Sequence, residues 1–226
     1  MLLPLLVAAA LWTAPPSSPA PGEYVLEGGN GTLTITRVAK ALSFKLEVIG
    51  ANAHVCELEG TVTGDLGQVH SDACAVQLKV KGDAVEVAAK DAEACRSWCG
   101  ARAWFGGRYL MPTPSCAAAQ VKASRGAFKR HSAAHAFAEA KADLTPLLER
   151  CEPVLSRFDL WWIRNDLAIT LHHLGDDAGC RSVLEPMTQL ARTPDDELGG
   201  AEPAFEDLYR KVAKATRANL KACEKK

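Results

Sequence analysis

The hydrophobic pattern of this 226-residue chain changes its period once, near residue 113, and no other feature constrains the fold as much. Before that point apolar side chains recur at every second residue, as on a strand with one buried face. After it they recur at steps of three and four, as on an amphipathic helix. We therefore expect an α+β fold, with an antiparallel β domain over 23–112 followed by an all-α domain over 115–226.

Strand-like segments in the first half alternate with short turns that are rich in glycine. They are expected at 32–38, 42–48, 55–62, 74–80, 84–89 and, as a last strand, 108–111. Short strands joined by short turns form antiparallel meanders, so we expect a small barrel or sandwich of six or seven strands. Pro112 and Pro114 mark the end of this domain, because proline cannot continue a ladder, and Ser115 is the expected cap of the first helix.

The second half is expected to contain five helices. Their predicted ranges are 116–131, 134–151, 160–174, 178–191 and 203–223. The clearest pattern lies between Leu160 and Cys180, where Asp159 is the expected N-cap of one helix and Gly175 ends it. Asp176 then opens the next helix. These features predict a helical hairpin.

This hairpin has a counterpart 40 residues earlier in the chain. The matching positions are Ala140, Leu144, Pro146 and Leu147 with Cys180, Leu184, Pro186 and Met187. The helical half resembles tetratricopeptide repeats, on the four positions Ala168, Leu171, Gly175 and Cys180, where that family has small, aromatic, glycine and alanine residues. The resemblance implies stacked hairpins whose first helices line a concave side.

The eight cysteines all lie after residue 55, and their even number predicts disulfides in an oxidising compartment. Paired Cys-x-x-Cys knuckles are absent, so neither a structural metal nor another cofactor is expected. Antiparallel helical hairpins place the start of one helix beside the end of the next, which predicts the pairs Cys116–Cys151 and Cys180–Cys223. In the β domain the register favours Cys56–Cys74 with Cys95–Cys99, and Cys56–Cys95 with Cys74–Cys99 is left open.

Residues 1–20 are expected to form a secretory signal peptide. Leu2 to Trp12 is an apolar run broken only by Pro4, and it is shorter than the roughly 20 residues that span a bilayer. Cleavage is expected between Ala10 and Gly22, which would leave a periplasmic or secreted protein without a membrane anchor. The formal net charge of −1 argues against nucleic acid as a partner.

Two surfaces are candidates for binding a protein partner. The tetratricopeptide resemblance implies a groove for an acidic peptide or its terminal carboxylate, lined by Lys122, Arg125, Lys129, Trp162, Asn165, Ile169 and His172. The second candidate is the aromatic and arginine-rich segment 95–109, with Trp98, Arg102 and Trp104 as anchors of an exposed loop. The alternative for this segment is that its aromatic side chains fill the end of the barrel.

Catalysis and metal binding are not expected. His131 and His135 have a spacing that can hold zinc, but the glutamate of the His-Glu-x-x-His zinc peptidases is missing between them. The segment 95–109, together with His54-x-Cys56-x-Leu58-x-Gly60, resembles bacterial periplasmic proteins that are loosely grouped with lysozyme inhibitors. The sequence thus predicts a non-catalytic protein–protein interaction protein of the bacterial envelope. The alternatives are an inhibitor of a lysozyme-type cell-wall lytic enzyme and an envelope hydrolase.

Overall fold

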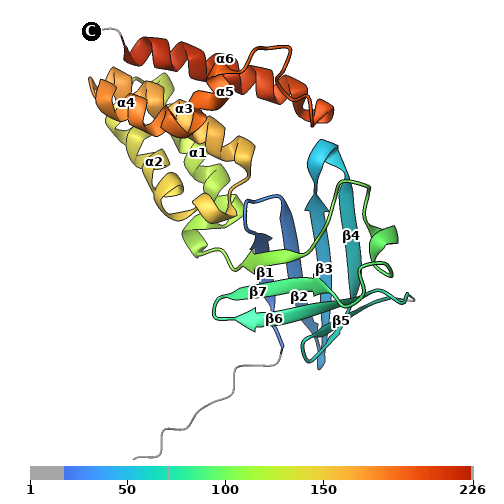
Figure 1. Ribbon diagram of the computed structural model, residues 1–226. Coiled ribbons are helices and arrows are strands. Elements are labelled where there is room, and N and C mark those ends of the chain that lie inside the picture. Colours follow the sequence, from blue (N-terminus) through green and yellow to red (C-terminus); the bar gives the residue numbers. More distant parts are fainter. Residues whose placement is uncertain (1–17, 71, 225–226) are drawn as a thin grey trace, which may run out of the picture.

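The computed structural model describes residues 18–70 and 72–224, and it joins an N-terminal antiparallel β-barrel to a set of packed helices (Figure 1). This arrangement confirms the α+β class and the order of its two halves. The predicted signal peptide falls almost wholly on residues 1–17, outside the described residues. None of the helices in the described ranges has a stretch that is long and apolar enough to cross a membrane.

The barrel strands follow one another in chain order, and β1 pairs with β8 to close the sheet. They are β1 (Gly22–Leu26), β2 (Gly31–Val38), β3 (Ala41–Ile49), β4 (Val55–Thr63), β5 (Leu66–Val69), β6 (Ala75–Lys81), β7 (Ala84–Ala89) and β8 (Gly107–Leu110). The eight strands exceed the predicted six or seven. The two strands outside the predicted ranges are β1 and β5. Gly64, with a φ of +63°, completes the turn after β4 early and leaves Leu66 and Gly67 in β5.

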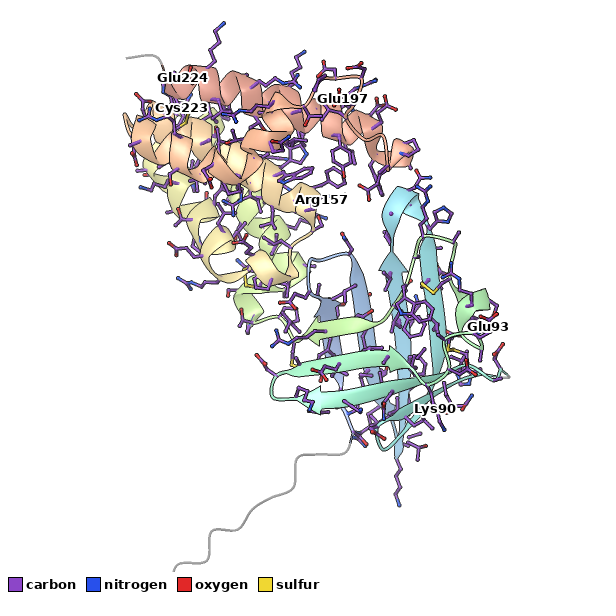
Figure 2. The ribbon with its side chains drawn as sticks, in the orientation of Figure 1. Lys90, Glu93, Arg157, Glu197, Cys223 and Glu224 are labelled. Atoms are coloured by element: carbon purple, nitrogen blue, oxygen red, sulfur yellow. A yellow bond between two sulfur atoms is a disulfide. The ribbon has the colours of Figure 1, made fainter. Side chains whose placement is uncertain are left out.

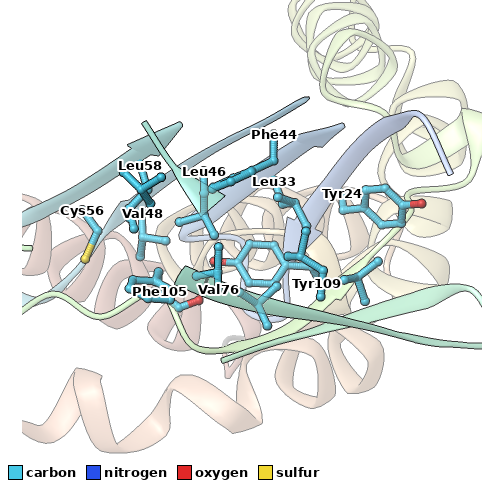
Figure 3. Packing of buried hydrophobic residues seen from close by; sticks show 14 of the residues in the cluster. Tyr24, Leu33, Phe44, Leu46, Val48, Cys56, Leu58, Val76, Phe105 and Tyr109 are labelled. Carbon is cyan, nitrogen blue, oxygen red and sulfur yellow. Dashed lines mark hydrogen bonds between the residues drawn. The ribbon is translucent and has the colours of Figure 1, made fainter. Parts of the chain in front are cut away.

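The barrel interior holds the core of the first half (Figure 3). In β3, for example, Leu42, Phe44, Leu46 and Val48 point inward and are buried, as the alternating pattern predicts. Phe105 and Tyr109 are both fully buried in the same core, and the Tyr109 hydroxyl donates a 2.8 Å hydrogen bond to the Phe105 carbonyl. Burial raises the pKa of Tyr109, so this phenol remains a neutral donor.

Both predicted pairing schemes for the β-domain cysteines are wrong. The structure joins Cys56 to Cys99 and Cys74 to Cys95. Cys56 lies in β4 and Cys74 directly precedes β6, so the unpredicted strand β5 lies between them and keeps them apart. Cys95 and Cys99 flank the short 3₁₀ turn η2 (Arg96–Trp98); Cys99 bonds to Cys56 in β4, and Cys95 bonds to Cys74 just before β6.

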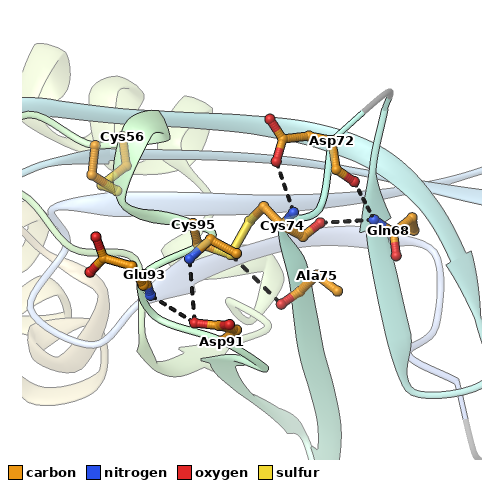
Figure 4. The surroundings of a disulfide bond; sticks show 10 residues. Cys56, Gln68, Asp72, Cys74, Ala75, Asp91, Glu93 and Cys95 are labelled. Carbon is orange, nitrogen blue, oxygen red and sulfur yellow. Dashed lines mark hydrogen bonds between the residues drawn. A yellow bond between two sulfur atoms is a disulfide. The ribbon is translucent and has the colours of Figure 1, made fainter.

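The Cys74–Cys95 bridge is surrounded by a polar turn that positions Cys74 (Figure 4). The Asp72 carboxylate accepts the Cys74 N–H at 2.9 Å, and the Gln68 amide donates to the Cys74 carbonyl at 3.0 Å. In the helical half, the two predicted disulfides, Cys116–Cys151 and Cys180–Cys223, are confirmed. Four disulfides indicate an oxidising environment, as in the periplasm or outside the cell.

The helical half contains longer helices and short 3₁₀ turns. They are η3 (Pro114–Cys116), α1 (Ala118–Ala133), α2 (Phe137–Arg150), η4 (Glu152–Val154), α3 (Arg157–His173), α4 (Asp177–Leu184), η5 (Glu185–Met187), α5 (Thr188–Arg192), η6 (Pro203–Phe205) and α6 (Glu206–Cys223). The predicted fourth helix, 178–191, is interrupted at η5, where Pro186 has no N–H for the helical ladder.

Three predicted helix caps can be compared with the structure. Asp176 caps α4 as predicted, because its carboxylate accepts the Gly179 N–H. Asp159 is not the N-cap of α3; Ser156 holds that position, and its side chain accepts the Asp159 N–H. Ser115 lies within η3 and caps no helix, since α1 begins after Ala117 without a side-chain cap.

The predicted 40-residue repeat is visible in the backbone of the two hairpins. At the first turn the N–H groups of Ala134, His135 and Ala136 donate to the carbonyls of Arg130, Ser132 and His131. At the second turn Leu174, Gly175 and Asp176 donate to Thr170, His172 and Leu171, which is the same pattern shifted by 40 residues. Six of the eight matched side chains are buried in the helical core: Ala140, Leu144, Leu147, Cys180, Leu184 and Met187.

Candidate functional site

In the described residues, hydrogen bonds join the barrel to the helices at two places. At the first, the Gly28 N–H donates to the Pro153 carbonyl at 2.8 Å, and Gly29 lies so close that a Cβ there would be 2.2 Å from the Ser156 nitrogen. At the second, the Arg102 guanidinium donates to the Ala201 carbonyl at 2.9 Å. A cleft that is open to solvent lies between the barrel and the helices, in the region between these two contacts.

The Asn52 side chain strengthens the second contact by accepting the Ala204 N–H at 2.7 Å. Two adjoining pockets, of about 600 and 630 Å³, make up the cleft, and both are lined by Gly29, Thr32 and Ser156. These volumes lie within the range of about 300–1,000 Å³ that is usual for ligand pockets. Because ligand sites occur preferentially between domains, the cleft is the best candidate for a binding site in the described residues.

Cationic side chains of α1 line the larger pocket. Lys122, Arg125 and Lys129 lie at helical spacing on one face of α1, opposite the barrel residues Glu23 and Val25. Arg125 pairs with Asp159 at 2.9 Å, whereas Lys122 and Lys129 are exposed and make no ion pair among the described residues. The sequence predicted this trio as a binding face, and the structure brings all three into one pocket.

A second carboxyl group, that of Asp166, lies on α3 next to these cations. Its nearest cation in an ion pair is Arg125, whose Nη2 is 4.0 Å from Asp166 Oδ2. Burial raises the pKa of Asp166 to about 6, although the charges of Arg125 and Lys129 oppose this shift. The net positive charge of the α1 face therefore grows as the pH falls through 6.

The smaller pocket has a different chemistry. Its barrel wall is formed by the backbone of Gly28 to Thr32 and by Glu47, Ile49, Gly50 and Ala51. Its helical wall is formed by Arg157 and Phe158 at the start of α3 and by Glu202 and Phe205 before α6. Figure 2 shows Arg157 on the side of the helices that faces the barrel. This pocket combines aromatic faces with carboxylates.

Two α3 residues of the predicted groove, Asn165 and His172, have partners other than the α1 cations. Asn165 is buried against α6, and its amide donates to Thr216 Oγ1 at 3.1 Å and accepts from Asn219. His172 lies at the far end of α3 and pairs with Asp177 at 2.6 Å. Trp162 packs against the helical core and Ile169 is half-buried on α3. The groove prediction is thus wrong for Asn165, because α6 covers the face of α3 that carries it.

The aromatic side chains of the segment 95–109, apart from Trp104, pack in or against the barrel core. Phe105, Tyr109 and Ala103 belong to the barrel core, and Trp98 packs against it with its indole N–H buried and unpaired among the described residues. Trp104 is 38% exposed and stacks on Phe105 with the ring centroids 4.7 Å apart. Arg102 is exposed and forms the second contact between the halves. Of the three proposed anchors, only Trp104 is free to meet a partner.

The histidines at the hairpin ends are engaged within the helical half. His131 Nδ1 lies 2.7 Å from an oxygen of Asp143, and His135 occupies the left-handed turn position with a φ of +55°. His173 stacks on Phe137 with the ring centroids 4.3 Å apart. No group of three or more His, Cys, Asp or Glu side chains suited to a metal ion occurs in the part of the chain that the structure describes.

Several cleft residues were not predicted as functional, among them Glu23, Arg157, Glu202 and Phe205. They belong to three segments that are far apart in the sequence, and no motif connects them. The pair of aromatic residues on either side of Asp159 and Leu160 was the only local signal, because aromatic side chains are enriched in binding sites. Neither a protein family, nor a curated protein, nor a solved structure matches this chain.

Proposed function

We propose that the protein is an exported, non-catalytic binding protein whose interdomain cleft holds an acidic segment of a protein partner. The observation that carries this proposal is the α1 face, where Lys122, Arg125 and Lys129 line one pocket of about 630 Å³. Lysine and arginine groups at hydrogen-bonding distance are the usual partners of peptide carboxylates. The apolar residues Val121 and Leu155 line the same pocket and offer contacts to the rest of the peptide.

The helical half is, in this proposal, tetratricopeptide-like. The repeated turn and the buried residues at matching positions of the two hairpins support it. In such a stack α1 and α3 are the first helices, and α6 packs beside α3 and α4. The barrel then forms the second wall of the binding site that α1 lines, in place of an open concave surface.

Export is supported by the four disulfides, which persist where the surroundings are oxidising. The apolar run from Leu2 to Trp12 is the proposed signal for this export. The partner is accordingly sought among envelope or secreted proteins.

The test uses a fluorescein-labelled peptide, Gly-Gly-Glu-Glu-Leu-Glu, and its Gln-for-Glu, amidated analogue, with binding followed by fluorescence anisotropy. Wild-type protein is expected to bind the acidic peptide at least tenfold more tightly. The double variant Lys122→Glu, Lys129→Glu should lose this preference, because two unpaired cations become carboxylates. Lys141→Glu, Lys214→Glu makes the same change of net charge at exposed positions outside the cleft.

The control pair separates a local site from a general charge effect. If both double variants weaken binding equally, the α1 face is not the site. If the wild-type protein does not distinguish the two peptides, the acidic-segment proposal is wrong.

A second candidate function is inhibition of a lysozyme-type enzyme, and the exposed Trp104 favours it. The ring lies outside the barrel on a segment that the Cys56–Cys99 bridge holds in place, and rigid aromatic anchors are typical of tight interfaces. The mature protein would be added in excess to lysozyme digestion of cell walls. Inhibition that disappears in Trp104→Ala supports this candidate, and unchanged lysis removes it for the lysozyme tested.

A further inference from the structure

Arg157, which lines the smaller pocket, lies within a group of three aromatic rings. Its guanidinium carbon is 5.2 Å from the ring centroid of Phe158, 5.3 Å from that of Trp161 and 5.1 Å from that of Tyr209. Each distance is within the range of about 6 Å in which a cation is attracted to a ring face. Arg157 Nη2 also lies 2.6 Å from Glu202 Oε2. We call Phe158, Trp161, Tyr209 and Glu202 the cation cage.

The cage is held together by contacts among its own members. Phe158 and Trp161 have ring centroids 5.4 Å apart, and Tyr209 lies 5.3 Å from Phe158 and 5.5 Å from Trp161. The Tyr209 hydroxyl donates a hydrogen bond to Glu202. These contacts do not involve Arg157, so they remain when its side chain leaves.

The electrostatics of the cage suit a cation. Burial works against the charge of Glu202, but hydrogen bonds from Tyr209 and Arg157 outweigh it, and the pKa of Glu202 is lowered. Burial and the hydrogen bond to Glu202 raise the pKa of Tyr209 to about 12, which keeps the phenol a donor. The cage therefore presents one carboxylate and three ring faces at neutral pH.

The cage is partly accessible to solvent, because the Arg157 side chain that fills it is itself partly exposed. The Arg157 side chain is 43% exposed, whereas Glu202 beneath it is 16% exposed. Arg157, Phe158 and Glu202 all line the cleft that contacts solvent, so a ligand in the cleft reaches the cage directly.

We propose that the cation cage is a binding site for the guanidinium or ammonium group of a partner, and that Arg157 fills it in the unbound protein. A partner cation exchanges with a group of the same charge, so the cage is never left with an unpaired carboxylate. Because Arg157 competes from within the chain, it lowers the apparent affinity by the fraction of molecules in which the cage is open. This site is separate from the α1 pocket, and neither proposal depends on the other.

The probe for this proposal is N-acetyl-arginine amide, with the neutral isostere N-acetyl-citrulline amide as its control. Binding is measured by NMR titration. Arg157→Ala is expected to bind the arginine probe about tenfold more tightly than wild type, since the internal competitor is gone. Arg210→Ala is the matched control, because Arg210 forms an ion pair with Glu206 that involves no ring. Adding Glu202→Gln to Arg157→Ala should remove the gain.

A second measurement needs no variant and uses the wild-type protein. The Arg157 side-chain Nε–H resonance is shifted by the surrounding rings, and saturating arginine probe should move it toward the position of a free arginine. The citrulline probe should leave it unchanged. The proposal is overturned if this resonance does not respond to the arginine probe, or if folded Arg157→Ala binds that probe no better than wild type.

Discussion

Replacing Asp166 with asparagine tests how burial sets the charge beside the α1 cations. The Asp166 side chain is 29% exposed and its pKa is raised from 3.8 to about 6 by burial, against the opposing charges of Arg125 and Lys129. Ionising this carboxyl in the folded protein therefore costs free energy that the unfolded chain does not spend. Asparagine has nearly the same shape and never ionises.

The size and sign of the effect follow from proton linkage. A shift of about two units, at 1.36 kcal/mol per unit, is about 3 kcal/mol, which we reduce to about 2 kcal/mol because part of the side chain remains in water. Between pH 4 and 6 the native protein holds a proton that the unfolded chain has released, so the free energy of unfolding falls as the pH rises. Asp166→Asn should thus stabilise the protein by about 2 kcal/mol at pH 8 and hardly at all near pH 3.5.

The assay is urea unfolding of wild type and Asp166→Asn at half-unit steps from pH 3.5 to 8, followed by tryptophan fluorescence. The difference between the two proteins isolates this carboxyl from all other titrating groups. Asp196→Asn, at an exposed position between α5 and α6, controls for the loss of one negative charge. A difference that is constant across the pH range, or a destabilised variant at pH 8, would refute the reasoning from burial.

Three further predictions concern packing. Gly29→Ala should loosen the contact between barrel and helices and lower the free energy of unfolding by about 1–3 kcal/mol, because its Cβ would overlap the Ser156 backbone. Gly28→Ala is the control, since Gly28 also has a positive φ but a Cβ there meets no atom within 4 Å. The radius of gyration measured by small-angle X-ray scattering should increase only for Gly29→Ala. Asn165→Ala should lower the free energy of unfolding in urea by about 1–2 kcal/mol, because the buried side chain loses its hydrogen bonds with Thr216 and Asn219 on α6, and an unchanged midpoint would contradict its place in the core. The double variant Cys74→Ser, Cys95→Ser should lose about 3 kcal/mol of its free energy of unfolding, because it lacks one disulfide. Mass mapping of the wild-type protein should recover a peptide that links Cys74 to Cys95, and a peptide that links Cys56 to Cys74 would contradict the order of the barrel strands.

The parts of the fold that were predictable depend on neighbours in the sequence. The alternation in β3 and the turn at Gly175 both come from side chains a few residues apart, and both are present. The helical disulfides were predictable for the same reason, since a hairpin of known length places Cys116 beside Cys151. The Lys122 to Lys129 face of α1 was also visible, because it needs only the helical period.

The β-domain pairing was missed because it depends on one short strand. Leu66–Val69 has few apolar residues and follows a glycine turn, so its pattern is too brief to recognise. Its presence moves Cys56 away from Cys74, and every further pairing follows from that displacement. A local error of four residues thus became a wrong disulfide framework.

The sequence by itself determined the two kinds of secondary structure, their boundary near Pro112, the hairpin repeat and the cationic face of α1, because short-range periodicity encodes them all. Only the tertiary structure decided where that face points. The cleft exists because Asn52 meets Ala204 and Gly29 meets Ser156, and such contacts between distant segments depend on the shapes of two completed halves. The cation cage arises in the same way, from α3 and a segment some 45 residues later that meet only after folding.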